Sequence, residues 1–364
     1  MIVIGTDTHK QSHTCGAVDG DTARALAERT ARARKGGFDE LLIWARKLGH
    51  ERVWAIEDCR HVSGAFERFL VSRGERSVRV APKHMAGARN SARERGKSDS
   101  IDAFAIARAA LREGVETLPT AHLDEHALEI RLLLDHRDDL VSDRCADQRR
   151  LRWHLHDLWP ELEIPTGALD RDKWLSKIAG RLARAEQGAR VRVARELLRQ
   201  VKERTRRIRA LERELEPLVA AYAPQLLEER GCGPLTAAKL IGEIAGAERF
   251  GSDAKLARMG GVAPIPASSG KTSRHRLDRG GNRQLNCALH RLAVNKGKYC
   301  PESAAYLERK QAEGKSRREA LRCFKRHLAR RVWRLLRAPT PDGSDPLALT
   351  TITTATRPQL AAVT

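Results

Sequence analysis

The hydrophobic positions in the first third of the chain follow two different periods. A short apolar or alternating pattern, typical of strands, recurs in five segments: residues 2–6, 12–19, 24–31, 53–57 and 77–81. Apolar residues three and four apart, typical of helices, occupy three others: residues 36–48, 63–73 and 98–112. A meander of three strands followed by alternating helices and strands predicts a layered α/β domain that ends near residue 120.

The middle of the chain, residues 125–222, shows no strand pattern. Its apolar residues recur at intervals of three and four, which predicts two long helices in a coiled-coil hairpin or a dimerisation arm. The looser first seam comprises Ile130, Leu134, Val141, Cys145, Leu151, Leu155 and Leu158, and the second comprises Ala194, Leu197, Val201, Arg204, Ile208, Leu211, Leu215 and Leu218. Arg204 is the one polar position in the second seam.

The other faces of the second long helix are rich in cations. They carry Arg190, Arg192, Arg195, Arg199, Lys202, Arg206, Arg207 and Arg209. Such a face is most often simply solvated, but the local excess of arginine over acid also suits contact with nucleic acid.

The C-terminal third has a mixed composition. A stretch rich in glycine, serine and proline at residues 260–282 precedes two expected helices, at residues 283–295 and 316–337. The tail from Pro339 is rich in threonine, proline and alanine without periodicity, which is typical of disorder. We therefore divide the chain into an α/β domain (residues 1–122), a helical coiled-coil region (123–225), a mainly α domain (226–338) and a tail (339–364).

Composition narrows the choice of partner. The chain has 364 residues, a formal net charge of +21 and a pI near 10.3, which favours a polyanionic partner such as nucleic acid. Aromatic residues are only 4%, so base stacking is not the expected main binding mode. Seven scattered cysteines without a CxxC pair argue against a disulfide framework or zinc site, and no apolar run is long enough for a membrane span. These features predict a cytoplasmic, nucleoid-associated protein.

Four acidic residues stand where they can meet. Asp7 follows the first apolar run in GTDTHK, Glu57 ends the fourth predicted strand, and Asp99 and Asp102 lie one helical turn apart in KSDSIDA. Four clustered carboxylates require cations, and hard oxygen ligands suit Mg²⁺ or Mn²⁺, which can polarise a phosphodiester. His9 is expected to contact a ligand carboxylate or a phosphate rather than to bind the metal. Each acid taken alone is more commonly an ordinary surface or capping residue, and only the set indicates catalysis.

A second constellation lies in the loop GGVAPIPASSGKTSRHRLDRGGNRQLN, residues 260–286. Five basic residues lie close in the sequence to its serines: Lys271, Arg274, His275, Arg276 and Arg279. A serine among phosphate-binding cations can act as a nucleophile towards DNA phosphorus, although a basic Gly/Ser loop is more often a passive backbone clamp. Ser269, directly before Gly270, is the favoured attacking residue, with Ser268 and Ser273 as alternatives.

A third motif, GCGPLTAAKL, resembles a helix-hairpin-helix. Backbone N–H groups around Gly231 and Gly233, at the start of a helix, would bind a phosphate without reading sequence, and Lys239 on that helix is a further candidate contact. The alternative is a plain helix-turn-helix packing unit.

Taken in order, GTDTHK, AIED, KSDSIDA, GGVAPIPASSGK and RGGNRQLN resemble the DEDD insertion-sequence transposases, the family of bridge-RNA-guided recombinases. The resemblance covers residues 2–338. One departure is Asn286, where many members have arginine; Arg283 and Arg291 are near enough in the sequence to substitute.

The resemblance implies a ribonuclease-H-like (RuvC-like) domain in which Asp7, Glu57, Asp99 and Asp102 bind Mg²⁺, and a C-terminal transposase domain in which Ser269 becomes linked to DNA. It further implies a guide RNA, donor and target DNA, and dimers that pair into a tetramer with composite sites. In that setting base pairing supplies specificity, and the +21 charge holds RNA and DNA phosphates.

Two other functions remain open on the sequence. A junction-resolving type of nuclease would use metal alone, with residues 260–286 clamping DNA. A degenerate protein that only binds nucleic acid would need neither the four acids nor Ser269, and their presence argues against it.

Overall fold

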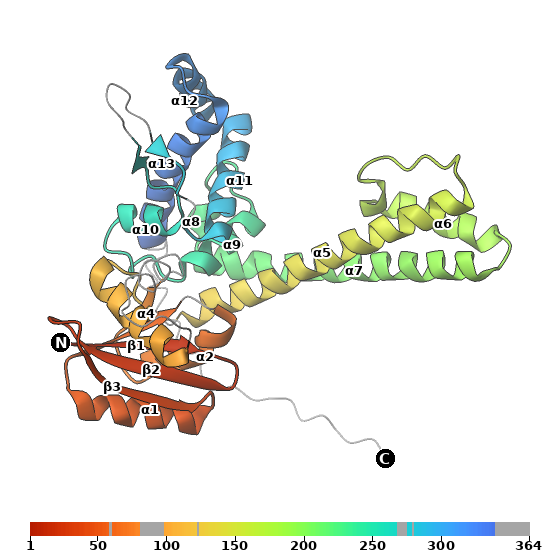
Figure 1. Ribbon diagram of the computed structural model, residues 1–364. Coiled ribbons are helices and arrows are strands. Elements are labelled where there is room, and N and C mark those ends of the chain that lie inside the picture. The colour runs from red at the N-terminus through yellow and green to blue at the C-terminus, as the bar shows by residue number, and fades with distance from the viewer. Residues whose placement is uncertain (58–59, 81–97, 122–123, 268–274, 279, 339–364) are drawn as a thin grey trace.

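The computed structural model describes residues 1–57, 60–80, 98–121, 124–267, 275–278 and 280–338 (Figure 1). The tail at residues 339–364, for which we predict disorder, lies outside this set, as do Ser269, Lys271, Arg274 and Arg279. The described chain combines one mixed sheet with many helices and is mostly helical.

The N-terminal part contains the five expected strands. They are β1 (Ile2–Thr8), β2 (Ser12–Asp19), β3 (Ala25–Arg32), β4 (Arg52–Glu57) and β5 (Ser77–Val80). They form one sheet in the order β3-β2-β1-β4-β5. The first three strands are antiparallel neighbours, whereas β4 runs parallel to β1 and β5 parallel to β4. The meander and the alternating helices and strands are thus confirmed, and they place the C-terminal ends of β1 and β4 at the same edge.

Helices cover both faces of this sheet. On one face, α1 (Lys35–Leu48) and α2 (Arg60–Ser72) pack on Ile4, Trp54 and their neighbours. On the other face, α4 (Asp99–Glu113) packs on Val3 and the valines of β4 and β5. Residues 3, 5 and 7 of β1 alternate onto the α4 side, because successive side chains of a strand point to opposite faces. Asp7 therefore faces the helix that carries Asp99 and Asp102.

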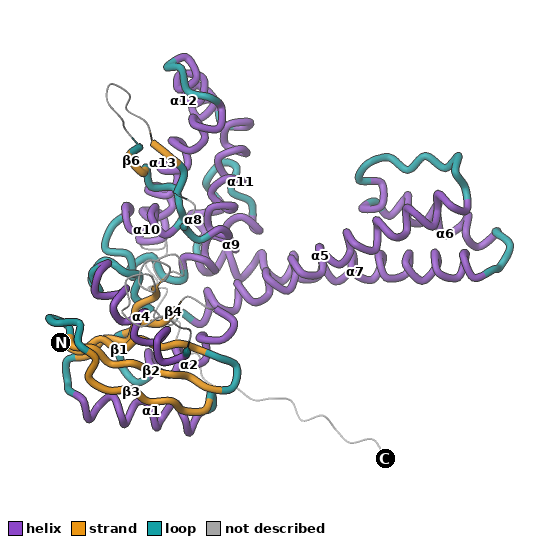
Figure 2. The backbone as a smooth tube through the Cα atoms, in the orientation of Figure 1, coloured by secondary structure: helices purple, strands orange, loops and turns teal. Residues whose placement is uncertain are grey.

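Two helices of 34 residues extend away from the sheet as a long arm (Figures 1 and 2). They are α5 (Glu125–Leu158) and α7 (Ala189–Tyr222), which pack against one another within the chain. At the far end lies α6 (Asp172–Arg184), preceded by a short 3-10 turn, Ala168–Asp170. Neither of these two elements follows from the hydrophobic pattern alone.

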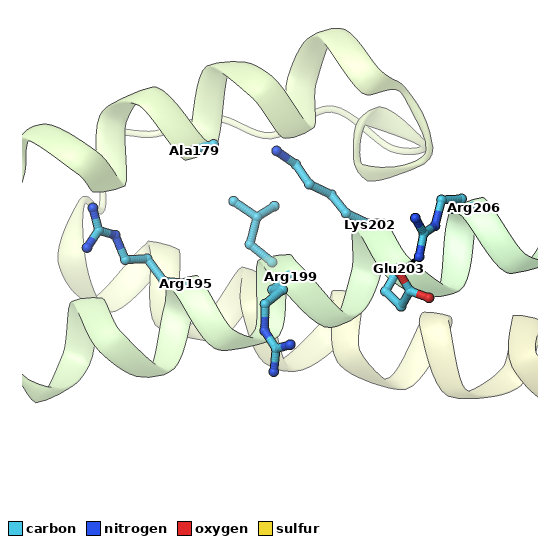
Figure 3. Close-up of a pocket in the computed structure, with 7 residues that line it drawn as sticks. Ala179, Arg195, Arg199, Lys202, Glu203 and Arg206 are labelled. Atoms are coloured by element: carbon cyan, nitrogen blue, oxygen red, sulfur yellow. Dashed lines mark hydrogen bonds and ion pairs between the residues drawn. The ribbon is translucent and has the colours of Figure 1, made fainter. Parts of the chain in front are cut away.

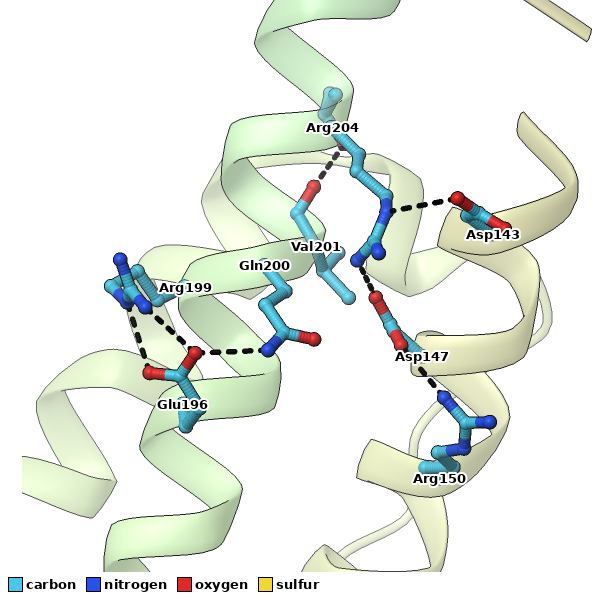
Figure 4. A network of polar contacts seen from close by, with 9 residues as sticks. Asp143, Asp147, Arg150, Glu196, Arg199, Gln200, Val201 and Arg204 are labelled. Carbon is cyan, nitrogen blue, oxygen red and sulfur yellow. Dashed lines mark hydrogen bonds and ion pairs between the residues drawn. The ribbon is translucent and has the colours of Figure 1, made fainter. Parts of the chain in front are cut away.

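One position in the predicted first seam is wrong. Cys145 is exposed, and the buried residue of that turn is Asp147, which is only 2% exposed. Asp147 is paired with Arg204, the polar position of the second seam, and also lies 3.2 Å from Arg150 (Figure 4). Arg204 reaches Asp143 as well, at 3.8 Å. A buried carboxylate is tolerated here because a cation from the facing helix neutralises it.

The C-terminal part is a helical assembly. Its elements are α8 (Pro224–Leu227), α9 (Pro234–Ile244), α10 (Asp253–Met259), β6 (Ile265–Pro266), β7 (His275–Arg276), α11 (Arg283–Tyr299), α12 (Pro301–Ala312) and α13 (Arg317–Arg337). Its apolar core also includes Ile130 of α5 and Leu215 and Val219 of α7. The base of the arm is therefore anchored in this core. The two expected helices correspond to α11 and α13, while the sequence did not single out α12.

In the part of the chain that the structure describes, every helix is too short or too polar to cross a membrane.

Candidate active site

The first feature of the site is the approach of α4 to the end of β1. Ser98 caps α4 by accepting a hydrogen bond from the Ile101 amide at 3.2 Å, so Asp99 and Asp102 lie in the first turn. Acidic side chains are favoured there because the helix N-terminus carries partial positive charge. Asp7 and Asp102 are both buried, at 7% and 6% exposure, whereas Asp99 is largely exposed.

His9 joins two of these acids. Its Nε2 atom lies 3.1 Å from Oδ2 of Asp7 and 3.3 Å from Oδ1 of Asp99. One ligand atom from each of Asp7, His9 and Asp99 falls within 4.8 Å of the others. His9 thus contacts two predicted ligands directly and lies in a group that could hold a metal ion.

The electrostatics of Asp7 reflect this crowding. Burial raises the pKa of its carboxyl group above the usual value. His9 opposes that shift through charge and hydrogen bonding, while the neighbouring charges of Asp102 and Asp99 add to it. Asp102 and Asp99 are therefore both close enough to influence Asp7. A site of this kind favours the binding of a cation, because the cation relieves repulsion among the carboxylates.

Glu57, the fourth predicted acid, ends β4 beside this cluster. The parallel register pairs Thr6 of β1 with Ile56 of β4, and one residue further along each strand stand Asp7 and Glu57. Alternation from Val53 and Ala55, which pack on the α4 side, puts position 57 on that same side. Glu57 is half-buried. The register thus places it at the sheet edge where Asp7 lies.

The donor set fits a hard divalent cation. Asp7, Asp99 and Asp102 offer carboxylate oxygens, the ligands that Mg²⁺ and Mn²⁺ prefer. An imidazole beside them is compatible with Mn²⁺ or with an orienting role, since hydrogen bonds commonly hold ligating carboxylates in place. These residues would hold the ion at the end of β1.

The second predicted constellation is only partly described. The two-residue strands β6 and β7 are antiparallel and pair Ile265 with Arg276 and Pro266 with His275, while residues 268–274 between them lie outside the described residues. Arg276 is exposed. It lines a cavity of about 990 Å³ that also borders Arg309 of α12 and Arg326 of α13. The strands that flank the segment with the candidate serines therefore border a basic cavity.

Asn286 has a structural role in this region. Its Nδ2 donates to the carbonyl oxygens of Gly260 and Gly261, at 2.7 and 3.3 Å, and its Oδ1 accepts from Nζ of Lys325 at 2.8 Å. Asn286 therefore ties Gly260 and Gly261, at the start of the stretch 260–286, to α13.

The third motif, GCGPLTAAKL, begins α9 as expected, but Lys239 on that helix contacts protein carboxylates. Gly233 is the N-cap of α9, and Gly231 has a positive φ of 85° against Asn295 of α11. Lys239 is buried, and its Nζ lies 3.2 Å from Oδ1 of Asp135 and 2.9 Å from Oδ2 of Asp138 on α5. Lys239 therefore joins α9 to the arm, and its pairing with two carboxylates inside the protein favours this structural role over the predicted contact with nucleic acid.

Sequence reasoning missed Gly5, which positions the site. A Cβ on Gly5 would come 2.0 Å from the carbonyl oxygen of Ala103 and 2.5 Å from the amide nitrogen of Ala107. Only glycine permits α4 to cross β1 this closely. A glycine inside a strand is the signal that could have revealed it, since it often marks close backbone approach.

Comparison with protein families agrees with this arrangement. Residues 4–160 match a family model for the DEDD type of transposase of insertion sequence IS110, and residues 223–308 match the model "Transposase IS116/IS110/IS902 family". The protein is therefore an enzyme of the DNA transposase class. Because both models describe one family and together span most of the chain, it belongs to the IS110/IS116/IS902 family of insertion-element transposases.

Individual relatives point the same way. The chain is 26% identical over 381 aligned residues to a 42 kDa protein of insertion element IS900 from Mycobacterium paratuberculosis, covering 92% of this chain and 95% of that protein. It is 29% identical over 295 residues to a 43.6 kDa protein of insertion element IS110 from Streptomyces coelicolor, covering 68% and 71%. Such a transposase acts on DNA.

Proposed function

We propose that this transposase cleaves and rejoins DNA strands with two groups of residues that act on the same phosphodiester. Asp7, Glu57, Asp99 and Asp102 form one group, and Ser269 provides the other. The observation that carries the proposal is the convergence at the end of β1, where His9 contacts both Asp7 and Asp99 and the charge of Asp102 acts on Asp7.

The carboxylates at the end of β1 hold Mg²⁺ or Mn²⁺ in this proposal. Such an ion, when bound, polarises a phosphodiester and offsets the negative charge that develops on its oxygens. Asp7 and Asp102 are buried, so their side chains are fixed by packing rather than by solvent. His9 holds Asp7 and Asp99 at a defined separation.

Ser269 is the proposed nucleophile. Its Oγ forms a bond to phosphorus and loses its proton, while one bridging P–O bond breaks and the departing strand end gains a proton as a free hydroxyl. The phosphoserine ester keeps the bond energy, so a strand-end hydroxyl can later reverse the step without an external energy source. Lys271, Arg274, Arg276 and Arg279 would hold the phosphate, and the amides near Gly231 and Gly233 would bind a neighbouring one.

Donor and target DNA are the proposed substrates, and a structured RNA from the element is the proposed guide. In this proposal the RNA selects the DNA by base pairing and the protein holds the phosphates. Two features support it: the net charge of +21, which suits phosphate binding, and the scarcity of aromatic residues that could stack on bases. The family resemblance supplies the RNA itself.

We further propose that the arm of α5 and α7 acts as a coiled coil that contacts a second copy, giving dimers and then a tetramer. The arm projects away from the sheet, which leaves much of its surface available to another protomer (Figure 1). In such an assembly the serine of one protomer would serve the carboxylates of another.

Trapping of the covalent intermediate tests the function. The full-length protein, its guide RNA and labelled donor DNA are incubated with Mg²⁺ and then denatured, and the DNA that remains attached to protein is measured. We expect an adduct with the wild-type chain and none with Ser269→Ala.

Ser268→Ala is the matched control and should keep the adduct. Cleavage by the wild-type chain without any adduct would instead support a metal-only junction-resolving nuclease whose C-terminal domain merely clamps DNA. An adduct that survives Ser269→Ala would contradict the assignment of Ser269 and move the nucleophile to another residue, such as Ser268 or Ser273.

A further inference from the structure

A straight row of cations runs along α7, far from the sheet. The row consists of Arg195, Arg199, Lys202, Arg206, Arg209 and Arg213, at successive spacings of four and three residues. This spacing keeps all six on one side of a helix. All six are exposed. With a rise of 1.5 Å per residue, the row is about 27 Å long, with a cation roughly every 5.4 Å.

A groove between α6 and α7 lies along this row. One part has a volume of about 560 Å³ and a second, adjoining part about 400 Å³, and both are lined by Lys202 and Arg206. Its α6 side is lined by the uncharged residues Leu175, Ser176 and Ala179 and by one acid, Asp172, which is paired with Arg209 at 2.8 Å. Figure 3 shows Lys202 projecting into the space between the two helices. The cations of the groove therefore come from α7, and the α6 side contributes mainly uncharged residues.

The carboxylates near this row hold its cations only weakly. Arg199 and Arg206 lie 2.7 and 2.6 Å from Glu196 and Glu203, but their side chains are 75% and 77% exposed. Exposed pairs of this kind contribute about 0–1 kcal/mol, so a phosphate can replace the carboxylate at little cost. Within the described part of the chain, no carboxylate is paired with Lys202, whereas its neighbours Arg199, Arg206 and Arg209 each have one.

We propose that the groove between α6 and α7 binds the sugar–phosphate backbone of a nucleic-acid duplex without reading its sequence. Arginine forks match phosphate oxygens two at a time, and a regular row of cations matches the regular charge of a duplex strand. No aromatic residue is among the described residues that line the groove, so stacking of unpaired bases has no platform there.

The inference depends on the proposed function only for the class of ligand. The groove lies at the far end of the arm from the carboxylates (Figure 1), so it anchors a duplex rather than taking part in strand cleavage. Binding measured without any cleavage therefore tests it separately, and loss of the adduct in Ser269→Ala would leave it unaffected.

The test compares two full-length double variants that each lose two positive charges. Lys202→Gln/Arg206→Gln removes the two cations shared by both parts of the groove. Lys35→Gln/Lys47→Gln removes two exposed lysines of α1, below the sheet, and is the matched control. Binding of a DNA duplex and of an RNA duplex of the same arbitrary sequence is measured by fluorescence anisotropy over a series of salt concentrations.

We expect the groove variant to bind at least one duplex about tenfold more weakly than the control does. Its slope of log affinity against log salt should also be shallower, by about 0.9 for each lost phosphate contact. The duplex that shows the larger change identifies which nucleic acid occupies the groove.

Equal affinities and slopes for the two variants, with both duplexes, would overturn the proposal, as would tighter competition by a polyglutamate peptide than by either duplex. Arg195→Gln/Arg213→Gln, at the two ends of the row, provides an independent second variant, and circular dichroism verifies that each variant is folded.

Discussion

Gly5 of β1 lies directly under Ala103 of α4, so closely that a Cβ on Gly5 would stand 2.0 Å from the Ala103 carbonyl oxygen. Asp7 follows Gly5 by two residues on the same face of the strand, and Asp102 directly precedes Ala103 on the helix. The backbone contact therefore sets how closely the two buried carboxylates approach one another.

Substitution of Gly5 by alanine should displace α4. Because the new methyl group would meet backbone atoms that cannot rotate away, we expect the free energy of unfolding to fall by about 3 kcal/mol, the upper part of the range for overpacked cores. Urea unfolding of Gly5→Ala and of the wild-type chain measures the difference in unfolding free energy. Gly36→Ala is the control, since a Cβ there has nothing within 4 Å, and it should leave stability unchanged or slightly higher. Equal stability of the two variants would contradict the account.

The ion pair between Asp147 and Arg204 should hold the arm together (Figure 4). In Arg204→Met the buried carboxylate of Asp147 loses its cation from α7, and we expect a loss of about 3 kcal/mol in unfolding free energy. The double variant Asp147→Leu/Arg204→Met should recover most of that loss, because two apolar residues can replace a buried pair. A double variant as unstable as Arg204→Met would show that the pair is not coupled.

Lys239 should stabilise the fold without contributing to the affinity for nucleic acid. Burial would lower the pKa of Lys239, but its contacts with Asp138 and Asp135 outweigh that effect and raise the pKa. The stabilisation is therefore fully present below the unfolded value near 10.5 and is lost as pH rises through the folded pKa.

We accordingly expect Lys239→Met to lower the melting temperature at pH 7, and the difference from wild type to shrink in strongly alkaline solution. The salt dependence of DNA binding should not change. A shallower salt slope in this variant would instead restore Lys239 as a phosphate contact.

Asp7 should make stability depend on divalent cations. The raised pKa of Asp7 means that ionisation costs folding energy, a cost absent below the unfolded value of 3.8 and complete above the folded pKa. Without metal at pH 7, Asp7→Asn should therefore melt at a higher temperature than wild type.

Added Mg²⁺ should raise the melting temperature of wild type, because a ligand that binds only the folded state stabilises it, and should have little effect on Asp7→Asn. Asp21→Asn, which alters an exposed acid in the turn after β2, is the control and should respond to Mg²⁺ like wild type. An identical response of all three chains would argue against a metal site at Asp7.

The strands and the helices beside them could be predicted because their patterns are local. β2 runs over Ser12–Asp19, as the alternation indicates, and α13 begins and ends within one residue of the predicted span. By contrast, α6 and α12 were missed because their few apolar residues are interspersed with glycine, proline and charged residues, which makes the helical pattern weak.

The remaining errors concern tertiary contacts. Cys145 fits the heptad spacing and Asp147 does not, yet Asp147 is the buried residue. Its carboxylate is buried because Arg204 lies opposite it on the facing helix. Likewise, the sequence places Lys239 after a glycine-rich turn, which favours a phosphate contact. Only the structure shows that Asp135 and Asp138 of α5 lie beside its ammonium group. The meeting of Asp7 with α4 follows from strand direction, but its closeness depends on Gly5.

The most direct test of the central claim measures DNA strand exchange by Asp102→Asn. The assay uses full-length protein, donor and target DNA, guide RNA and Mg²⁺, with Asp21→Asn as the control and circular dichroism to show that both variants are folded. The account predicts that exchange by Asp102→Asn falls by roughly a hundredfold or more, because a ligand of the cation that stabilises the reacting phosphate is lost, while the control keeps the wild-type rate. Exchange by a folded Asp102→Asn at the wild-type rate would contradict it.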